Sequence, residues 1–255
     1  MIDLFPTLLY WEKDVALELQ ERLATSITKI YNERAYYEDE NPIKGRVWRR
    51  LGLYDSKGNH ISDKKTGTTW QEKPPGEVSM EGVDGWKELR QIVHKHAIDY
   101  FKEITDYPHI AQLEHYWPVQ AWWSVFDEKD DYPWHYHSQY CMIGTYYVQH
   151  EPGHAPISFR SPINALVTNT IPGTSKVKLE ETIFPKTGDL LIWPPWLEHE
   201  VPGKDSYLYK KNDIQGLNKF YRDPDNEEYG KLRISISVCF LKPDIMLGYM
   251  NEKRE

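Results

Sequence analysis

The stretch that decides the fold is residues 134–148, WHYHSQYCMIGTYYV. Two histidines separated by one residue, His135 and His137, are followed by an aromatic and β-branched run, which is the composition of a β-strand. Alternate side chains of a strand share one face, so this spacing predicts that both imidazoles point to one place. Imidazoles placed in this way suit a divalent transition metal. The other interpretation, a pair of structural histidines, stays open at this point.

The composition of the 255-residue chain limits the class of protein. A formal net charge of −8 and a pI of about 5.7 argue against a nucleic-acid binder that works through a broad basic face. Cys141 and Cys239 both lie in apolar runs, which predicts reduced core residues and no disulfide framework. The first residues contain no basic segment and no long apolar segment, so we expect a cytoplasmic protein without membrane insertion. A homodimer is left open.

Helices are predicted in the first hundred residues. Apolar positions recur at three- and four-residue steps over 15–33, with Asp14 as the capping residue, and again over 86–105. The second helix carries His94 and His96. Residues two apart on a helix point in directions about 200° apart, so we reject this pair as a metal site.

Short apolar runs between turns make up the chain from about residue 112. The runs are 114–126, 139–149, 156–160, 164–169, 177–184, 189–193 and 232–241. Such a series predicts an antiparallel sandwich or barrel. We therefore predict a single domain over 1–255, with a helical buttress at 1–111 and a β-core at 112–241. The insert 202–231, rich in charges and aromatic rings, predicts a lid, with a solvated loop as the other interpretation.

Two later segments carry further candidate residues. Residues 188–201, GDLLIWPPWLEHEV, contain a strand, a Pro-Pro corner and then His199. Proline stops strand pairing, so His199 is predicted at a strand end, where it could complete a facial set of metal ligands. In residues 231–240, KLRISISVCF, the polar residues Arg233, Ser235 and Ser237 alternate with apolar ones. Inside a barrel that polar face could hold a carboxylate, since arginine binds carboxylates in a bidentate manner.

These segments together resemble the 2-oxoglutarate- and Fe(II)-dependent oxygenases, in the bacterial and phage branch with an H-x-H … S-G-x-Y-Y core. The motifs, in the order seen in that branch, are His-x-His, Gly-x-Tyr-Tyr-Val, Phe-x-x-Pro at 159–162, Gly-Asp-Leu-Leu-Ile-x-Pro-x-Trp-x-x-His and Arg-Ile-Ser-Ile-Ser. They cover residues 120–241. The resemblance implies a mainly β fold with flanking helices, whose core is a double-stranded β-helix of the jelly-roll, cupin-like kind.

The resemblance also implies a function. It is that of an oxidoreductase that uses Fe(II), 2-oxoglutarate and O₂ to hydroxylate a C–H bond of a small molecule or peptidyl residue, with release of succinate and CO₂. By match, His135 and His199 would be iron ligands, and Arg233 with Ser235 would hold the C5 carboxylate of 2-oxoglutarate. Tyr147 is expected to contribute to the binding of 2-oxoglutarate together with Arg233 and Ser235. The expected walls of the substrate pocket are Trp123, Val125 and Trp193.

One departure from the family concerns the second iron ligand. Most members have Asp or Glu where this chain has His137, so iron would lie either in a three-histidine set or beside a carboxylate such as Asp130 or Asp131. A three-histidine site is one charge unit more positive than the usual one. Two alternatives therefore stay open: a three-histidine cupin-type dioxygenase that does not use 2-oxoglutarate, and a non-catalytic β-sandwich binding module.

Overall fold

The computed structural model of the chain describes residues 8–35, 52–59, 80, 82–126, 132–152, 154–162, 180–202 and 233–243. The helices are a 3-10 turn at Leu17–Leu19, α1 (Gln20–Ala35), α2 (Trp86–Ile104) and α3 (Ile110–His115). The strands are β1 (Tyr10–Glu12), β2 (Gly52–Tyr54), β3 (Val119–Phe126), β4 (Tyr132–His135), β5 (Tyr140–Gln149), β6 (Ile157–Arg160), β7 (Glu180–Ile183), β8 (Leu190–Trp193), β9 (Glu198–Val201) and β10 (Arg233–Leu241).

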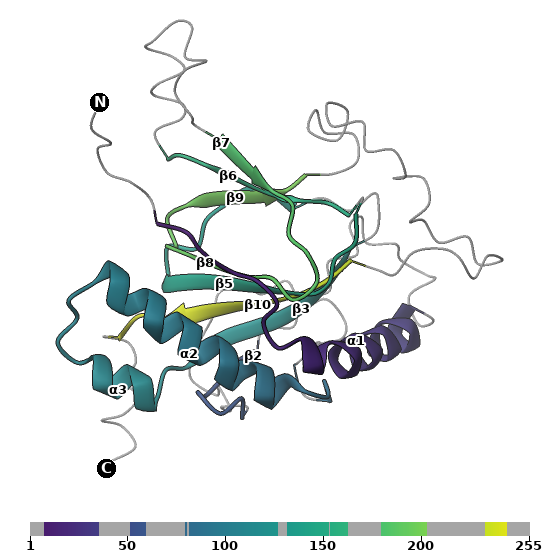
Figure 1. The fold of residues 1–255 in the computed structure, drawn as a ribbon, viewed down its shortest axis with the longest axis horizontal. Coiled ribbons are helices and arrows are strands. Elements are labelled where there is room, and N and C mark those ends of the chain that lie inside the picture. Colours follow the sequence, from purple (N-terminus) through teal and green to yellow (C-terminus); the bar gives the residue numbers. More distant parts are fainter. Residues whose placement is uncertain are drawn as a thin grey trace, which may run out of the picture.

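Two antiparallel sheets face each other (Figure 1). The larger has the strand order β1-β8-β5-β10-β3-β2, and the smaller has the order β4-β9-β6-β7. After β3 the chain passes back and forth between the sheets: β5, β8 and β10 lie in the larger sheet, and β4, the pair β6 and β7, and β9 lie in the smaller. This mainly antiparallel arrangement with few helices confirms the predicted fold class.

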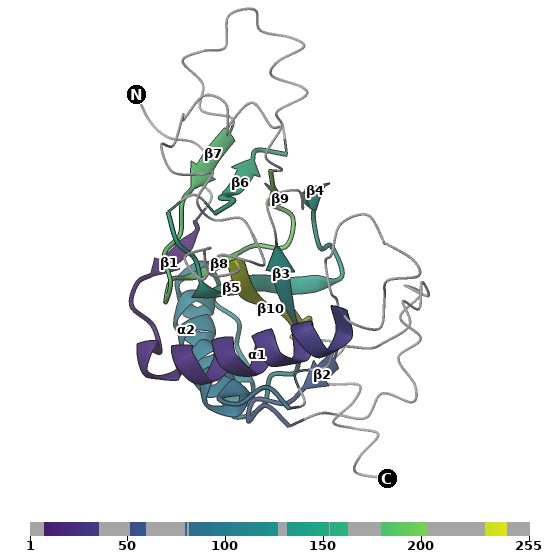
Figure 2. The ribbon, with the colours of Figure 1, turned by 90° about the vertical axis from the view of Figure 1, so that its right-hand side faces the viewer.

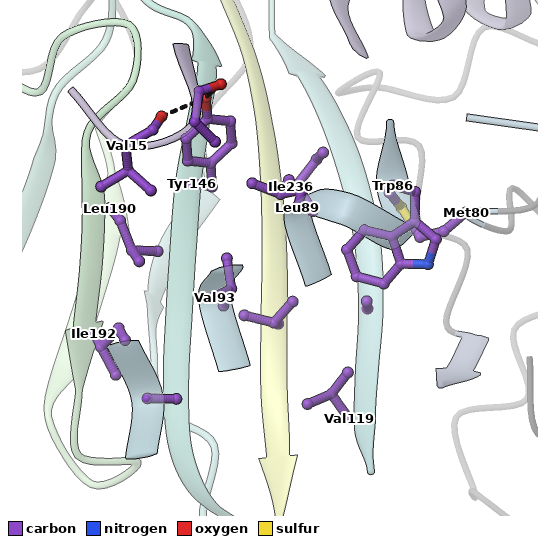
Figure 3. Packing of buried hydrophobic residues seen from close by; sticks show 14 of the residues in the cluster. Val15, Met80, Trp86, Leu89, Val93, Val119, Tyr146, Leu190, Ile192 and Ile236 are labelled. Carbon is purple, nitrogen blue, oxygen red and sulfur yellow. Dashed lines mark hydrogen bonds between the residues drawn. The ribbon is translucent and has the colours of Figure 1, made fainter. Parts of the chain in front are cut away.

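The helices α1 and α2 cover the face of the larger sheet that is turned away from the smaller one (Figures 1 and 2). The stripe of α2 predicted from the sequence, which includes Leu89, Val93 and Ala97, is buried against this face. Figure 3 shows Leu89 and Val93 among side chains of the sheet such as Ile236. Burying such side chains stabilises the fold by about 1.5–3 kcal/mol each. More of the buried apolar side chains belong to this cluster under the helices than to the cluster between the sheets.

Strand β10 lies in the middle of the larger sheet, between β5 and β3. Its apolar residues Ile234, Ile236 and Val238 belong to the core under the helices. Because side chains alternate along a strand, Arg233 and Ser235 point the other way, into the space between the sheets. The alternation read from the sequence therefore places a polar row inside the fold.

Several sequence predictions need correction. The strand predicted at 114–126 begins only at Val119, after Pro118, and residues 110–115 form α3, whose Leu113 is fully buried. Proline has no N–H for a ladder, so the strand begins after it. Asp14 does not cap a helix: it has a positive φ of 57°, and the 3-10 turn has no side-chain cap. Instead the Val15 N–H donates to the Gly188 carbonyl, so a tertiary contact fixes this turn.

Three predictions fall outside the described residues: most of the first strand (2–11), the strand at 164–169 and nearly all of the lid at 202–231. The division into a buttress and a core stays a prediction. Within the described part of the chain, no helix combines the length and the apolar character needed to cross a membrane.

Candidate metal centre

Three histidines meet between the two sheets. His135, His137 and His199 each offer one ring nitrogen, and these nitrogens lie within 4.8 Å of one another. The ring centroids of His135 and His199 are 4.2 Å apart, and those of His137 and His199 are 5.2 Å apart. His199 is buried, whereas the other two are half-buried, so the group opens to one side. Three convergent imidazoles with an open side are a suitable set for a divalent transition metal.

The elements that deliver these histidines differ from the sequence prediction. His135 ends β4 and lies opposite His199 of β9, so the small sheet itself brings these two together. His137 is not on a strand. It lies in the link from β4 to β5, where its backbone N–H donates to the Pro195 carbonyl at 2.9 Å. The position of His137 therefore depends on this contact of the link with Pro195, and β4 itself ends at His135.

Backbone carbonyls determine which ring nitrogen of His135 and of His199 carries the proton. His135 Nδ1 lies 2.8 Å from the Pro133 carbonyl, and His199 Nδ1 lies 3.0 Å from the Leu197 carbonyl. A carbonyl only accepts, so both Nδ1 atoms carry the proton and both Nε2 atoms keep a lone pair. Hydrogen bonds of this kind fix the tautomer and orientation of metal-binding histidines.

The surroundings keep His199 neutral. Burial lowers its pKa well below the ordinary histidine value, and the neighbouring His135 and His137 lower it further, against a small opposing effect of the Leu197 carbonyl. The ring of Trp193 packs on His199 with centroids 4.9 Å apart. Neutral imidazole is the form that binds metals, so His199 presents its nitrogen in the required state.

Arg233, Ser235 and Tyr147 line the same cavity as the three histidines. Arg233 is 3% exposed, and its Nε–H donates to the Ala155 carbonyl at 3.0 Å. Its guanidinium lies over the ring of Phe126 at 4.5 Å and near that of Tyr147 at 5.5 Å. A buried cation between aromatic rings is suited to bind an anion.

The Tyr147 hydroxyl is a second hydrogen-bond donor in this cavity. It is buried and has no hydrogen-bond partner among the described residues. Burial raises the pKa of Tyr147, and Arg233 opposes the shift only in part, so the hydroxyl stays protonated at neutral pH. Buried hydroxyls are normally hydrogen-bonded, so a carboxylate accepting here would complete the site. The donors present therefore fit one carboxylate group of 2-oxoglutarate.

The structure places only part of the predicted pocket wall in the cavity. Trp193 lines it, but Trp123 and Val125 do not. Those two side chains are fully buried on the opposite face of β3, in the core under the helices. Their neighbours Trp122 and Ser124 line the cavity instead, because adjacent residues of a strand point to opposite faces.

Other lining residues were also missed from the sequence. Tyr132 of β4 packs on His135 with ring centroids 4.2 Å apart, and Trp122 lies 6.3 Å from His137 by the same measure. Thr145 faces Ser237 across the sheet, with their hydroxyls 3.3 Å apart. Knowing which residues of β3, β5 and β10 lie opposite one another would have identified Trp122 and Thr145. This strand register cannot be read from the sequence. Asp130 and Asp131, the alternative iron ligands, lie outside the described residues.

The family model that matches the chain is described as "Putative 2OG-Fe(II) oxygenase" and covers residues 120–208, which include all three histidines. Over residues 120–208 the chain is similar to the 2OG-Fe(II) oxygenases. The match confirms the resemblance, the oxidoreductase class and the two cofactors that this family implies, Fe(II) and 2-oxoglutarate.

Solved structures provide distant likenesses. A prolyl-4-hydroxylase from Pseudomonas putida is 11% identical, with 92% of this chain and 93% of that chain covered and a TM-score of 0.40. AviO1 from Streptomyces viridochromogenes Tue57 is 11% identical, with 93% and 90% covered and a TM-score of 0.43. A bsmA homolog from Methylobium petroleophilum PM1 is 11% identical, with 89% and 86% covered and a TM-score of 0.44. No curated protein matches the chain. Likenesses this distant say nothing about the substrate of this oxygenase.

Proposed function

We propose that this oxygenase hydroxylates a C–H bond of a small molecule or peptidyl residue, with release of succinate and CO₂. Its iron would be held by three histidines and no carboxylate. The observation that carries the proposal is that one cavity is lined by both groups, the three histidines and Arg233 with Tyr147. A metal ion and a dicarboxylate could bind there at the same time.

His135, His137 and His199 would hold the iron. When bound, Fe(II) and 2-oxoglutarate supply oxygen activation coupled to oxidative decarboxylation, which the protein itself cannot perform. The histidines contribute neutral nitrogen ligands, and two of them are already in the required tautomer. Three neutral ligands leave the charge of the ion uncompensated, which favours a cosubstrate that binds through an anionic group.

Arg233, Ser235 and Tyr147 would orient 2-oxoglutarate. The guanidinium and the phenol would both donate to its C5 carboxylate, and the buried Ser235 hydroxyl lies on the same row of β10. Apolar side chains of the same cavity, such as Ile157 and Trp193, would exclude water from the reacting groups. These residues would hold the cosubstrate in one orientation and would take no protons themselves.

A second candidate function is favoured by the three-histidine set. A cupin-type dioxygenase with three histidines would bind iron in the same way but would not consume 2-oxoglutarate, and Arg233 would then hold a carboxylate of the substrate. The predicted cytoplasmic location and the homodimer stay predictions.

The test is an iron and succinate assay. Purified protein should bind about one Fe(II) per chain and form succinate from 2-oxoglutarate in the presence of O₂, and His135→Ala or His199→Ala should abolish both. Arg233→Ala should retain iron but raise the 2-oxoglutarate requirement roughly thirty- to a hundredfold, because a charge-assisted bidentate contact is lost. Iron-dependent O₂ consumption without succinate would favour the cupin alternative. Full iron retention in both histidine variants would mean that the site is elsewhere.

A further inference from the structure

The buried histidine His150 has no part in the proposed chemistry, yet it lies next to the group that would bind 2-oxoglutarate. It follows the last residue of β5 and is 5% exposed. Its ring packs edge-on against that of Tyr147, with centroids 5.4 Å apart. It lies in the turn from β5 to β6 and not on either strand, so sequence periodicity gives no reason for a buried histidine there.

One backbone carbonyl connects His150 with Arg233. The Ala155 oxygen lies 3.0 Å from His150 Nε2 and also 3.0 Å from Arg233 Nε. A carbonyl oxygen has two lone pairs and only accepts, so both nitrogens donate their hydrogen to it. His150 therefore shares its acceptor with the side chain of Arg233.

This shared acceptor determines how Arg233 is oriented. A guanidinium is planar, so a hydrogen bond at Nε fixes the plane in which its two terminal nitrogens lie. With Nε directed at Ala155, the Arg233 side chain lies in the wall of the cavity. A shift of the Ala155 carbonyl would turn the guanidinium and misplace both donors relative to a bound carboxylate.

The backbone of His150 is held from another direction. Its N–H donates to Thr187 Oγ1 at 2.9 Å, and its carbonyl accepts from the Thr187 N–H at 3.2 Å. Its imidazole then reaches five residues along the chain to Ala155. His150 therefore connects the Ala155 carbonyl, which accepts from Arg233, with the turn before β8. Burial keeps the pKa of His150 well below its ordinary value, and Arg233 lowers this pKa further.

We propose that His150 is a positioning residue for 2-oxoglutarate. It holds the Ala155 carbonyl in the place where that carbonyl orients the Arg233 guanidinium toward the cosubstrate. This inference rests on the proposed function, since it requires Arg233 to bind the C5 carboxylate.

A pair of substitutions isolates the hydrogen bond. The amide nitrogen of glutamine lies near the position of histidine Nε2, so His150→Gln can still donate to Ala155, whereas the shorter His150→Asn cannot reach. We expect His150→Asn to weaken 2-oxoglutarate binding roughly three- to tenfold, the effect of one net hydrogen bond, and His150→Gln to stay within about twofold of the unaltered protein. Anaerobic calorimetric titration of the Fe(II)-loaded protein measures this affinity, and iron affinity should be equal in all three.

A double-mutant cycle tests whether the effect acts through Arg233. In an Arg233→Leu background, His150→Asn should have no further effect on 2-oxoglutarate binding, because the guanidinium that it orients is gone. Equal affinities of the Asn and Gln variants, or the same loss in the Arg233→Leu background, would overturn the positioning role. Failure of the unaltered, iron-loaded protein to bind 2-oxoglutarate would instead contradict the proposed function.

Discussion

At the scale of single residues, His137 is where this chain departs from its family. It lies in the link from β4 to β5, and its backbone N–H donates to the Pro195 carbonyl. Its ring lies 4.9 Å from that of His135 by centroids, close enough to share one ion. A histidine at this position can act as a ligand or can orient one, and substitution separates the two roles.

We predict that His137→Ala loses most of its iron and that His137→Asp keeps it. The alanine variant leaves two ligands, whereas aspartate restores the commoner set of two histidines and a carboxylate. Iron content after anaerobic loading and gel filtration is the measurement. Asp130→Asn and Asp131→Asn serve as controls and should retain iron. If either of these empties the site while His137→Ala remains loaded, a carboxylate and not His137 is the ligand.

Tyr147 permits a prediction in which affinity and stability change differently. Tyr147→Phe removes a buried hydroxyl with no partner among the described residues, so the free energy of unfolding should be unchanged or slightly raised. The affinity for 2-oxoglutarate should fall roughly tenfold, because a hydrogen bond to a charged group is lost.

The adjacent Tyr146 provides the matched control. Its hydroxyl donates to the Val15 carbonyl at 2.9 Å, on the helix side of the sheet (Figure 3). Tyr146→Phe should therefore lower the free energy of unfolding by about 1 kcal/mol and leave the affinity for 2-oxoglutarate unaltered. Urea unfolding and calorimetric titration of both variants give the two quantities. A loss of stability in Tyr147→Phe would show that its hydroxyl already has a partner.

At the scale of elements, β4 is the weakly held part of the metal centre. It pairs with β9 at only two positions, Tyr132 with Val201 and His135 with His199, and the register is irregular between them. Pro133 lies in the strand and has no N–H to donate. On the sheet, Arg160 of β6 pairs with Glu198 of β9 and also lies over the ring of Trp134 at 4.4 Å. This side-chain contact connects the three strands β4, β9 and β6.

We predict that Glu198→Gln weakens iron binding roughly two- to fivefold, because Arg160 loses the carboxylate that holds it over Trp134 and β4 becomes more mobile. Anaerobic titration with Fe(II) against a competing chelator measures the change. Glu114→Gln breaks a comparable pair with Lys102 on the helices, and it should leave iron affinity unaltered. Equal iron affinity in both variants would show that the contact does not position His135.

At the scale of the whole molecule, the larger sheet separates two compartments. Its inner face carries the polar row of the cavity, and its outer face carries the apolar core under α1 and α2 (Figure 2). His150 is buried beside the cavity, and His94 of α2 is half-buried against α3, where its Nε2 contacts the Glu114 carbonyl. The surroundings of both side chains disfavour the protonated form and lower their pKa.

This burial predicts that acid destabilises the protein. Burial, and then the neighbouring Arg90, lowers the pKa of His94 to about 4, and the pKa of His150 is also well below its ordinary value. The unfolded chain therefore binds more protons than the native state below about pH 6.5, so the free energy of unfolding falls as the pH falls. Each histidine should contribute about 1 kcal/mol per pH unit in this range, and the contribution of His94 should be complete near pH 4.

Urea unfolding at pH 7.5, 6.5 and 5.5 tests this. His94→Gln should reduce the slope of stability against pH, whereas His109→Gln, at an exposed position in the link before α3, should not. An unchanged slope in His94→Gln would mean that this histidine is protonated in the native state.

The sequence by itself determined the features that depend on a fixed local period. The stripe of α2 and the alternation of Arg233, Ser235 and Ser237 on β10 follow from the geometry of a helix and a strand, and both agree with the structure. The His-x-His pair and His199 were identified as candidates for the same reason: each stands beside a recognisable strand or turn signal.

Only the tertiary structure decided which face of β3 is turned inward. One face of β3 packs against the helices and the other lines the cavity, so side chains on both faces are buried. The sequence is therefore apolar or aromatic at nearly every position, and its alternation does not indicate which face is turned inward. The choice of Trp122 over Trp123 follows from the register with β10, which pairs Ser124 with Ser235. His137 was likewise placed by a hydrogen bond to Pro195, 58 positions along the chain, and local periodicity cannot encode a contact between segments so far apart.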